Sequence, residues 1–524
     1  MTSQGGKNPR LFQGKKVLVM GLGLHGGGVS TVRWLVANGA KVTATDLRDN
    51  ETLVPSLRAL RGLPVRYVLG GHRAADFRSH DLIVVGPGVS HESPHIKVAK
   101  NAGKQIENDA SLFFRYLENP VIAVTGTRGK TTTTLWVAEL LKKKYLLVRQ
   151  SGTPENAELK EFGRINGKNV PAVVELSSWQ LEYLPRSKKA PHIAAITNIY
   201  AEHLNRYRDI KQYADAKANI FRYQQKDDML VLNYDDPWHR YFLKKRPKSD
   251  VYFTSTKVLP KKLNGAYVKN EEIVLRVPKN KQGRTLLKET TILSVGRFVR
   301  ERGKHNLENL LRAVLIAKLF DPKLNVTEHD VLRLPTPRMR QETIYRKVGL
   351  TIVNDSCATS PDGTVAAIRR FAKAGAGIQG GTLRIVPQGS TLYASPKPRI
   401  ILITGGTDKK LEFDGLAKEI KKYIPKRQLV LLEGSATTKL IAALRKQKYF
   451  TQYEPLEYLD LASCVKEAFR IARTNRGPTL GIKKGRSSVQ WVVLFSPAAA
   501  SFEKFLHEFD RGDQFNRLIR GQTK

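Results

Sequence analysis

The segment from Val121 to Lys142 constrains the fold more than any other part of the chain. It opens with an apolar run, Val-Ile-Ala-Val-Thr125, which has the length of a buried strand, and Thr125-Gly-Thr-Arg-Gly-Lys-Thr-Thr132 follows at once. A helix-like stretch then runs from Thr131 to Lys142. A buried strand, a glycine turn and a helix in this order are typical of parallel α/β sheets. The sequence therefore predicts such a sheet in the middle of the chain.

The same glycine turn predicts a phosphate-binding loop. Its glycines let backbone N–H groups curl around an anion at the start of the following helix. Lys130 would neutralise the β- and γ-phosphates of a nucleotide, and the Thr131 hydroxyl would bind magnesium. The loop is shorter than a full Walker motif, because Val124 stands where that motif has glycine. The alternative is an ordinary glycine turn that happens to carry a lysine.

Two further alternations of strand and helix flank this central region. The first opens with an apolar segment at 16–20 that ends in glycines, and strand-like segments follow at 41–46 and 81–85. The other begins after the proline-rich break at 334–337. Its expected strands lie near 350–353, 399–404, 429–432 and 491–495.

The length of the chain, 524 residues, exceeds the size at which one hydrophobic core keeps growing. We therefore predict an α/β protein of three domains, at residues 1–119, 120–333 and 334–524. Residues 251–300 show short alternating segments and are expected to form a small antiparallel hairpin region within the second domain. Residues 374–398 and 474–488 are expected to be long surface loops.

The charge balance is unusual, with 89 Lys and Arg against 47 Asp and Glu and a formal net charge of +42. Such an excess is typical of proteins that bind nucleic acids or anionic membranes, but it also raises the local concentration of polyphosphate substrates. The basic runs, such as 142–144 and 244–248, are short and scattered. A solvated basic surface is the expected explanation, and a nucleic-acid-binding NTPase is the alternative.

The cysteines and the N-terminal sequence indicate a cytoplasmic protein. Cys357 and Cys464 are the two cysteines, so no disulfide framework is expected, and neither has the spacing of a metal ligand. The first residues lack the apolar segment of a signal peptide. No run approaches the 18 apolar residues that a membrane span needs.

A second glycine motif lies near the N-terminus. Gly21-Leu-Gly-Leu-His-Gly26 follows the first strand-like segment, and Asp46 comes 20 residues after Gly26. In dinucleotide-binding domains such a turn approaches a diphosphate and such an acid contacts a ribose. By itself, the motif would favour an NAD-dependent enzyme.

Two polar segments follow strand-like segments of the central region. They are Glu175-Leu-Ser-Ser-Trp-Gln-Leu-Glu182 and Thr197-Asn-Ile-Tyr-Ala-Glu-His-Leu-Asn-Arg-Tyr207. Strand ends beside a phosphate loop are where an α/β sheet presents its ligands. Glu175 and His203 could each reach a magnesium ion, although this ion prefers oxygen to imidazole. Taken alone, either residue also fits an ordinary surface position.

The phosphate loop and these two segments together resemble the Mur ligase family, in their order and at similar separations. Within the family, the Ser-Ser-x-Gln-Leu-Glu segment, Ser496-Pro-Ala-Ala-Ala-Ser501 and Arg511-Gly512 look like the D-glutamate-adding members. The resemblance implies a Rossmann-like first domain, a central ATPase-like phosphate-loop domain and a Rossmann-like third domain. It implies a monomeric, ATP-dependent ligase that joins D-glutamate to UDP-N-acetylmuramoyl-L-alanine through an acyl phosphate.

The resemblance also assigns residues to the ATP and metal sites. It implies that Lys130, Lys217, Arg338 and His203 act in catalysis, and that two Mg²⁺ ions are bound by Thr131, Glu175, His203 and a carbamylated Lys217. Arg338 would reach the γ-phosphate. The residues matched to ATP binding are Gly126, Thr127, Arg128, Gly129, Lys130, Thr131, Thr132, Asn306, Asn309 and Asp355.

For the UDP substrate, the resemblance redirects the N-terminal glycine motif from NAD to a UDP diphosphate, with Asp46 at the uracil and Thr153 near the sugar. The residues matched to this site are Leu24, His25, Gly26, Asp46, Gly88, Ser177 and Gln180. The residues matched to the amino acid, a diacid, are Thr359, Lys409, Ser501 and Phe509. The sequence departs from the family at Cys357, where many relatives have lysine, and at Glu508, which is aligned with an aromatic residue.

Several functions remain open at this level. The nearest are sister Mur ligases that add another amino acid or a dipeptide, and folylpolyglutamate synthetases, since their phosphate loops are alike. A basic phosphate-loop NTPase that binds nucleic acid is a second class, although no recognition motif supports it and neither nucleic acid nor membrane is an expected partner. A pseudoenzyme is a third, and the intact Lys130, Glu175, His203 and Lys217 argue against it.

Overall fold

The structure, a computed structural model, describes residues 10–90, 92–148, 150–152, 157–202, 206–281, 284–303, 306–373, 399–450, 455–474 and 491–523. The chain divides into two compact units, Met1–Pro335 and Thr336–Lys524. The first unit contains two β-sheets and the second contains one. Among the described segments, no helix has the length and apolar character that crossing a bilayer requires.

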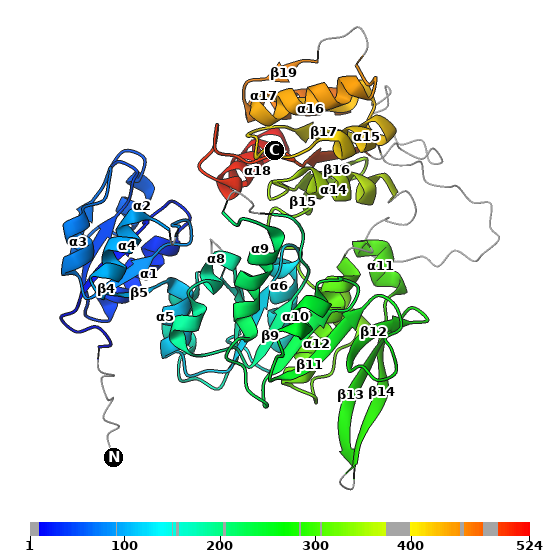
Figure 1. The fold of residues 1–524 in the computed structure, drawn as a ribbon. Helices are drawn as coiled ribbons and strands as arrows, with labels where there is room; N and C mark the ends of the chain where they lie inside the picture. Colours follow the sequence, from blue (N-terminus) through cyan, green and yellow to red (C-terminus); the bar gives the residue numbers. More distant parts are fainter. Residues whose placement is uncertain are drawn as a thin grey trace, which may run out of the picture. The chain divides into compact units, whose positions relative to one another are not determined.

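The first sheet has five parallel strands in the order β3-β2-β1-β4-β5, drawn in blue in Figure 1. The chain adds β2 and β3 on one side of β1, and then returns to add β4 and β5 on the other side. The loops after β1 and β4 therefore border a crevice at the switch point of the sheet. The strands are β1 (Lys16–Met20), β2 (Lys41–Thr45), β3 (Val65–Val68), β4 (Leu82–Val85) and β5 (Gln105–Glu107). The helices are α1 (Gly27–Ala37), α2 (Val54–Ala59), α3 (Ala74–Ser79), α4 (Pro94–Asn101) and α5 (Asp109–Tyr116).

The second sheet has nine strands in the order β14-β13-β12-β11-β10-β9-β6-β8-β7. The strands are β6 (Val121–Thr125), β7 (Gln150–Ser151), β8 (Ala172–Glu175), β9 (Ile193–Ile196), β10 (Met229–Asn233), β11 (Asp250–Ser255), β12 (Gly265–Lys269), β13 (Glu272–Lys281) and β14 (Arg284–Ser294). The helices are α6 (Lys130–Leu141), α7 (Glu158–Ile165), α8 (Ser178–Leu181), α9 (Ile210–Ala218), α10 (His239–Lys244), α11 (Gly296–Arg302), α12 (Leu307–Phe320) and α13 (Glu328–Leu332), with 3-10 turns η1 (Leu184–Ser187) and η2 (Asn219–Phe221).

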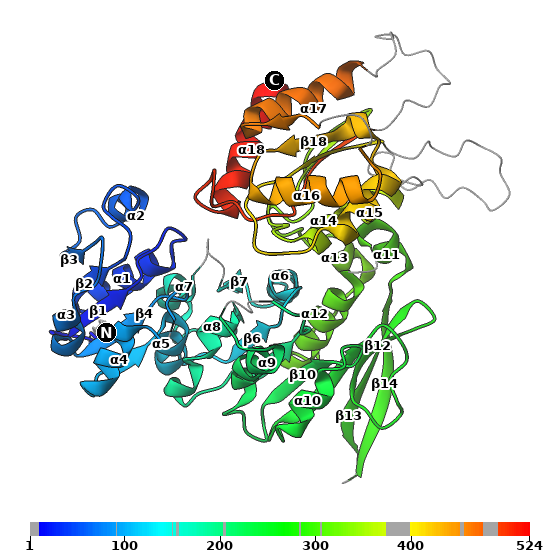
Figure 2. The same cartoon turned by 45° about the horizontal axis from the view of Figure 1, so that its top comes forward.

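The predicted hairpin region at 251–300 is present in part. β13 and β14 pair antiparallel and extend as a long hairpin from the sheet edge, as both Figure 1 and Figure 2 show. β11, however, runs parallel to both β10 and β12 and continues the central sheet, whereas β12 pairs antiparallel with β13. The prediction was wrong for β11 because its residues 252–255 are buried in succession. Its side chains therefore do not alternate between a buried and an exposed face.

The third sheet has the order β15-β16-β20-β17-β18-β19, and only β15 is antiparallel among its described strands. The strands are β15 (Glu342–Lys347), β16 (Leu350–Asn354), β17 (Arg399–Thr404), β18 (Leu429–Leu432), β19 (Glu457–Tyr458) and β20 (Trp491–Phe495). The helices are α14 (Pro361–Lys373), α15 (Asp414–Tyr423), α16 (Ser435–Lys446), α17 (Leu461–Thr474) and α18 (Glu508–Thr523), with the 3-10 turn η4 (Lys426–Gln428). The four predicted strands of this region are all found.

Helices on both faces of each sheet explain the continuous apolar runs on which the strand predictions rested. β4, β6, β9 and β16 are buried along their whole length, as expected for parallel strands covered on both sides. Two separate apolar cores lie on the opposite faces of the third sheet. The predicted α/β fold with parallel-rich sheets is therefore confirmed. The predicted loops at 374–398 and 474–488 lie outside the described residues, apart from residue 474, which ends α17.

Candidate active site

The predicted phosphate loop lies between β6 and α6, with both of its glycines in close contact with other segments. Gly126 has a φ of 142° and Gly129 a φ of 82°, in the region that favours glycine. A Cβ on Gly126 would lie 1.8 Å from Thr197 Oγ1, and one on Gly129 would lie 2.3 Å from Asn309 Oδ1. Neither position can hold a larger residue without displacing these neighbours.

The residues after β9 hold the loop from one side. The Thr127 N–H donates to the Asn198 carbonyl at 2.9 Å, and the Arg128 N–H donates to Asn198 Oδ1 at the same distance. In return, Thr197 Oγ1 donates to the Arg128 carbonyl at 2.6 Å. The conformation of the loop is thus set by hydrogen bonds to a neighbouring strand end.

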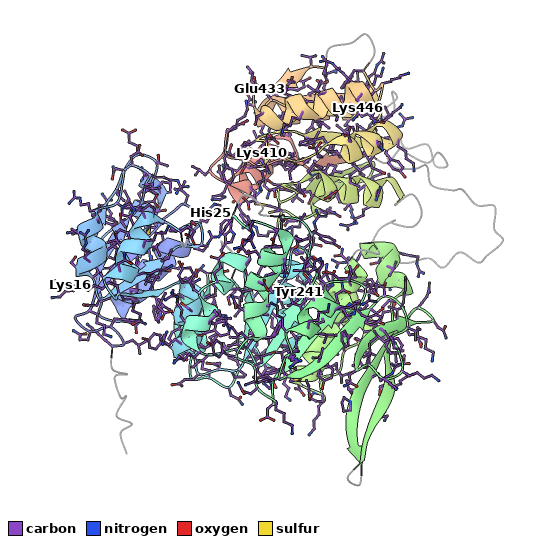
Figure 3. All side chains as sticks on the ribbon, in the orientation of Figure 1. Lys16, His25, Tyr241, Lys410, Glu433 and Lys446 are labelled. Atoms are coloured by element: carbon purple, nitrogen blue, oxygen red, sulfur yellow. The ribbon has the colours of Figure 1, made fainter. Side chains whose placement is uncertain are left out.

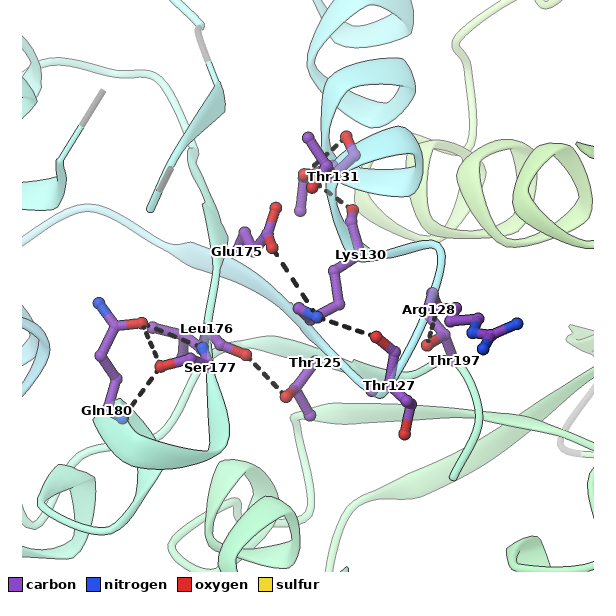
Figure 4. A network of polar contacts seen from close by, with 12 residues as sticks. Thr125, Thr127, Arg128, Lys130, Thr131, Glu175, Leu176, Ser177, Gln180 and Thr197 are labelled. Carbon is purple, nitrogen blue, oxygen red and sulfur yellow. Dashed lines mark hydrogen bonds and ion pairs between the residues drawn. The ribbon is translucent and has the colours of Figure 1, made fainter. Parts of the chain in front are cut away.

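Lys130 and Glu175 face each other across this loop (Figure 4). Lys130 Nζ lies 4.0 Å from Glu175 Oε1 and donates to the Thr127 carbonyl at 3.2 Å. The other carboxylate oxygen of Glu175 is buried and has no hydrogen-bond partner among the described residues. Thr131 and Thr132 follow in the first turn of α6. His203 lies outside the described residues.

Lys217, on α9, reaches the back of the same loop. Its side chain is 1% exposed, and Nζ donates to the Gly126 carbonyl at 2.8 Å and to Thr125 Oγ1 at 3.4 Å. Burial lowers the pKa of Lys217 well below its ordinary value, and the charge of Lys130 adds to this effect. The surroundings of Lys217 therefore disfavour the protonated ammonium form relative to an exposed lysine.

Asn306 and Asn309 lie at the start of α12, which packs against α6. Asn309 Oδ1 accepts from Thr133 Oγ1 at 3.4 Å, and its Nδ2 donates to Asn306 Oδ1 at 3.4 Å. Asn306 Nδ2 in turn donates to the Arg302 carbonyl at 2.8 Å. The amide of Asn309 thus lies directly against the phosphate loop.

The glycine motif of the first sheet follows β1 at the switch point. Asp46 Oδ2 accepts from the Gly23 N–H at 2.9 Å, and Oδ1 accepts from the Arg48 N–H at 3.0 Å. The loop after β4 that contains Gly88 is adjacent, because the Gly86 N–H donates to the Met20 carbonyl at 2.8 Å. Leu24, His25 and Gly26 complete the turn into α1, and Figure 3 labels His25 there.

The N-termini of α1 and α6 share one property. Each helix follows a glycine with a positive φ, Gly26 or Gly129, and in the described part of the chain no side chain caps either of them. Their first backbone N–H groups and the helix dipole favour an anion at these positions. The structure therefore offers one anion-binding position beside each of the first two sheets.

The Ser-Ser-x-Gln segment is explained by a capping box at the start of α8. The Ser177 side chain accepts from the Gln180 N–H, and Gln180 Oε1 accepts from the Ser177 N–H and hydroxyl at 3.0 and 2.9 Å. Gln180 Nε2 then donates to the buried Glu158 at 2.7 Å. These hydrogen bonds fix the side chains of Ser177 and Gln180, which follow Glu175 by two and five residues.

Arg206 and Glu182 belong to the two polar segments after β8 and β9, and the sequence predicts no role for either. Arg206 binds both oxygens of Glu182, at 3.1 and 2.6 Å, and donates to the Val89 carbonyl at 3.3 Å. It thus connects the loop beside Gly88 to the segment after β8. Only the contact across two sheets shows this role, because the three residues are distant in the sequence.

In the second unit, Asp355 is buried at the end of β16. Its carboxylate accepts from Ser496 Oγ at 2.8 Å and from the Gln341 N–H at 2.9 Å. Burial is the largest effect and raises the pKa of Asp355 from about 3.8 to about 7. No cation lies within hydrogen-bonding distance of this carboxylate among the described residues.

Arg511 joins the two segments that carry predicted amino-acid contacts. Its guanidinium is fully buried and donates to the carbonyls of Ser356, Ala499 and Ala500 at 2.8, 3.0 and 2.8 Å. Thr359 follows the first of these segments and Ser501 follows the second. Ser501 Oγ is buried and has no hydrogen-bond partner among the described residues. A buried hydroxyl of this kind is suited to a ligand.

The remaining predicted residues of this unit lie nearer the surface. Lys409 is exposed, on a loop tied to the Ser501 segment by two backbone hydrogen bonds between Thr407 and Ala500, at 3.1 and 3.0 Å. Phe509 is half-buried in the first turn of α18. Arg338 forms an ion pair with Asp513 at 2.7 Å.

Cys357 is one of the two positions at which the sequence is expected to depart from the family pattern. It is buried, and its N–H donates to the Met339 carbonyl at 3.0 Å. Burial raises the pKa of the Cys357 thiol to about 12, so this position supplies no charge for a ligand.

The buried Asp355 predicts a pH dependence of stability. Because its folded pKa is raised, the folded state keeps a proton between about pH 3.8 and about pH 7, where the unfolded chain has lost it. The free energy of unfolding therefore falls as pH rises through this window, by up to roughly 4 kcal/mol from this group. Asp355→Asn, which has no charge at any pH, should remove this contribution.

Urea unfolding of the wild type and of Asp355→Asn, at about pH 4 and about pH 8, measures the effect. The variant is expected to gain stability relative to the wild type as pH rises. A difference between the two proteins that stays constant over this range would contradict the buried-carboxyl account.

Comparison with known proteins identifies the family. A model described as the Mur ligase middle domain matches residues 124–317, and one described as the Mur ligase MurD-like N-terminal domain matches residues 15–108. A protein of Roseiflexus sp. (strain RS-1) named UDP-N-acetylmuramoylalanine--D-glutamate ligase is 35% identical over 515 residues, covering 97% of this chain and 99% of that protein. A protein of the same name from Borreliella burgdorferi is 32% identical over 506 residues, covering 96% and 97%.

Among solved structures, the MurF ligase of Thermotoga maritima in complex with ADP matches 98% of this chain and 97% of its own, with 14% identity and a TM-score of 0.49. The sequence matches are decisive by themselves, because they extend over nearly the whole of both chains at 30% identity or more. The two family models also cover the phosphate loop and the N-terminal glycine motif. The chain therefore belongs to the Mur ligase family.

Proposed function

We propose that this Mur ligase uses ATP to join D-glutamate to UDP-N-acetylmuramoyl-L-alanine in the synthesis of a peptidoglycan precursor. The observation that carries the proposal is the meeting of Lys130, Glu175 and Lys217 around one phosphate loop. The names of the full-length relatives supply the substrates. Conversion of a carboxylate to an amide needs an activated acyl group, and a phosphate loop suits its formation from ATP.

The residues of the loop are suited to hold the triphosphate. The N–H groups of Thr127 and Arg128 already donate to Asn198, so the backbone N–H groups at the N-terminus of α6 would surround the phosphates, with Lys130 beside the γ-phosphate. Asn306 and Asn309 would lie near the adenosine. Arg338, which now pairs with Asp513, would exchange that partner for the γ-phosphate, and Asp355 would lie near the nucleotide.

The donor set fits magnesium. The buried, unpartnered oxygen of Glu175 is a hard ligand, and Thr131 and His203 would complete the site. Lys217, whose buried amine donates to the Gly126 carbonyl of the same loop, would contribute an oxygen ligand after carbamylation. Bound Mg²⁺ would neutralise phosphate charge, and two ions are expected.

The chain's own residues would then order the reaction. Lys130 stabilises the charge that develops when the alanyl carboxylate attacks the γ-phosphate. The acyl phosphate and ADP result. The D-glutamate amine next attacks the acyl carbon, and phosphate leaves as the amide forms. Positioning of the three reactants supplies much of the rate, because the attack becomes effectively intramolecular.

The UDP substrate is assigned to the first sheet. Leu24, His25, Gly26 and Gly88 would surround the diphosphate at the N-terminus of α1. Asp46 braces the glycine turn through Gly23 and retains lone pairs that can accept from the uracil. Ser177 and Gln180, fixed by their capping box, would contact the sugar end, where Thr153 is also expected.

D-Glutamate is assigned to the second unit. The unpartnered Ser501 hydroxyl, Thr359 and the ammonium group of Lys409 are donors for two carboxylates. Phe509 would pack nearby. Because Arg511 fixes the backbone of both segments, we infer that the Ser501 and Thr359 hydroxyls are held ready before the amino acid binds.

The wider assignments rest on the same proposal. We infer a monomeric cytoplasmic enzyme, because its substrates are soluble nucleotides and an amino acid. The proposed domains are residues 1–119, 120–333 and 334–524, one for each sheet. The net charge of +42 would then act by attracting anionic substrates.

Release of phosphate from Mg-ATP in the presence of UDP-N-acetylmuramoyl-L-alanine tests the function. D-Glutamate is expected to stimulate release by at least about a hundredfold over L-alanine or a diamino acid, since a site built for two carboxylates rejects analogues that leave its donors unpaired. L-Glutamate, which has the same two carboxylates on the mirror-image centre, tests the stereochemistry separately. Stimulation by another amino acid would keep the ligase and change its substrate. No stimulation by any of them would overturn the proposal.

A further inference from the structure

Arg312 is a buried cation that no sequence motif explains. It lies in α12 between apolar residues, and its side chain is 0% exposed. A buried arginine is unusual unless its donors have fixed acceptors. Its Nε has no hydrogen-bond partner among the described residues, whereas two of its partners, Asn309 and Thr197, lie against the glycines of the phosphate loop.

The first partner is the side chain of Asn309. Arg312 Nη1 donates to Asn309 Oδ1 at 3.2 Å. The same oxygen accepts from Thr133 Oγ1 in α6 and lies against Gly129. Because two donors converge on this oxygen, the amide of Asn309 cannot rotate without losing both bonds. Arg312 therefore fixes which atoms of Asn309 face the loop.

The second partner, Thr197, lies at the end of β9, in the segment that holds the phosphate loop through hydrogen bonds. Arg312 Nη2 donates to the Thr197 carbonyl at 3.3 Å. Thr197 is the residue whose hydroxyl binds the Arg128 carbonyl and whose N–H donates to Thr125. One guanidinium thus joins the start of α12 to the end of β9, and the phosphate loop is held between them.

The charge of Arg312 has no buried counter-ion among its described hydrogen bonds. Its one carboxylate partner in a hydrogen bond, Glu308 at 3.1 Å, is 37% exposed and is therefore solvated. Replacing a buried ion by an apolar residue of similar volume is often neutral for stability or favourable. The cation is better explained by the anion that the neighbouring loop is shaped to bind.

We propose that Arg312 is a positioning residue for the nucleotide, which holds Asn309 and Thr197 so that the phosphate loop is preformed for a nucleoside triphosphate. The proposal rests on the function proposed above, because it requires that this loop binds ATP. When the loop is preformed, the binding free energy of ATP is not reduced by the cost of ordering the loop. Loss of Arg312 should therefore weaken ATP binding directly.

Calorimetric titration of the full chain with Mg-ATP, without the other substrates, tests this role. Arg312→Met keeps the volume and removes the donors, and it is expected to raise the Kd for ATP by about tenfold or more, which corresponds to roughly 1.4 kcal/mol. Arg312→Lys keeps the charge but not the two forked donors of the guanidinium. Its Kd for ATP should lie between those of Arg312→Met and the wild type. The thermal midpoint of nucleotide-free Arg312→Met should stay near that of the wild type.

Arg276 offers a matched control. It is also buried, in β13 of the same sheet, and it donates to the Pro260 carbonyl at 2.7 Å and to Glu289 at 2.7 Å. Its described contacts include none to the phosphate loop. Arg276→Met should therefore leave the Kd for ATP within about twofold of the wild-type value.

The outcomes separate this proposal from the proposed function. Tight ATP binding by Arg312→Met, equal to that of the wild type, would overturn the role of Arg312 and leave the ligase intact. Equal losses of affinity for ATP and for UDP-N-acetylmuramoyl-L-alanine would show a general structural defect and would also overturn it. Failure of the wild type itself to bind ATP would refute the proposed function, and this inference with it.

Discussion

Replacement of Lys130 by methionine is expected to lower kcat/KM for ATP by roughly a hundredfold to a thousandfold, the usual effect of removing one preorganised charge from a transition state. Lys130 begins α6, and its ammonium group lies 4.0 Å from Glu175 in the nucleotide-free loop. ATP would provide a stronger partner, since the γ-phosphate carries more charge than one carboxylate. Phosphate release with both co-substrates present measures the loss.

Lys142 is the matched control for this variant. It lies at the opposite end of α6, where it pairs with Glu139 and is partly exposed. Lys142→Met removes the same charge from the same helix but leaves the loop untouched, so kcat/KM should change by less than about twofold. Near-normal activity of Lys130→Met would contradict the assignment of the phosphate loop.

Removal of carbon dioxide is expected to abolish most of the activity, and added bicarbonate is expected to restore it. The amine of Lys217 is buried and its pKa is lowered well below the ordinary value, chiefly by burial, which makes the nucleophilic neutral form more accessible than in an exposed lysine. Attack of this amine on CO₂ forms a carbamate and releases one proton. The carbamate would place an anionic oxygen ligand beside Glu175 and the bound phosphates.

A carbon-13 resonance from labelled bicarbonate, present in the wild type and absent in Lys217→Met, would identify the carbamate. The variant should lose about a hundredfold or more in kcat and should not respond to bicarbonate, since it lacks the group that stabilises charge. Lys211→Met, an exposed position on the same helix, is the control and should respond as the wild type does. Full activity of the wild type without CO₂ would contradict a carbamylated Lys217.

The sequence predicted most of the strands because parallel strands covered by helices on both faces must be apolar throughout. The segments at 16–20, 399–404, 429–432 and 491–495 coincide with β1, β17, β18 and β20. β15 was not predicted, since this antiparallel edge strand is exposed or half-buried along its length. Edge strands have weak patterns because only part of their surface meets the core.

The sequence also located the phosphate loop, because a glycine turn between a buried strand and a helix is a local pattern with a local cause. Lys130, Glu175 and Lys217 were matched to one site from motifs, and the structure brings the three together. His203 and Thr153 lie outside the described residues, so their roles stay predictions. The roles of the other matched residues are proposals supported by their positions.

What the sequence determined by itself was the α/β fold, the resemblance to the Mur ligase family and the short glycine motifs that are typical of anion-binding loops. These depend on residues that are neighbours along the chain. Only the tertiary structure showed that Asp46 accepts from the Gly23 N–H and that Arg511 joins two distant segments. It also showed that Arg312 binds Asn309, which lies against the phosphate loop. Each of these contacts joins residues far apart in the sequence. A hydrogen bond depends on the distance and direction between two groups, and folding alone sets both.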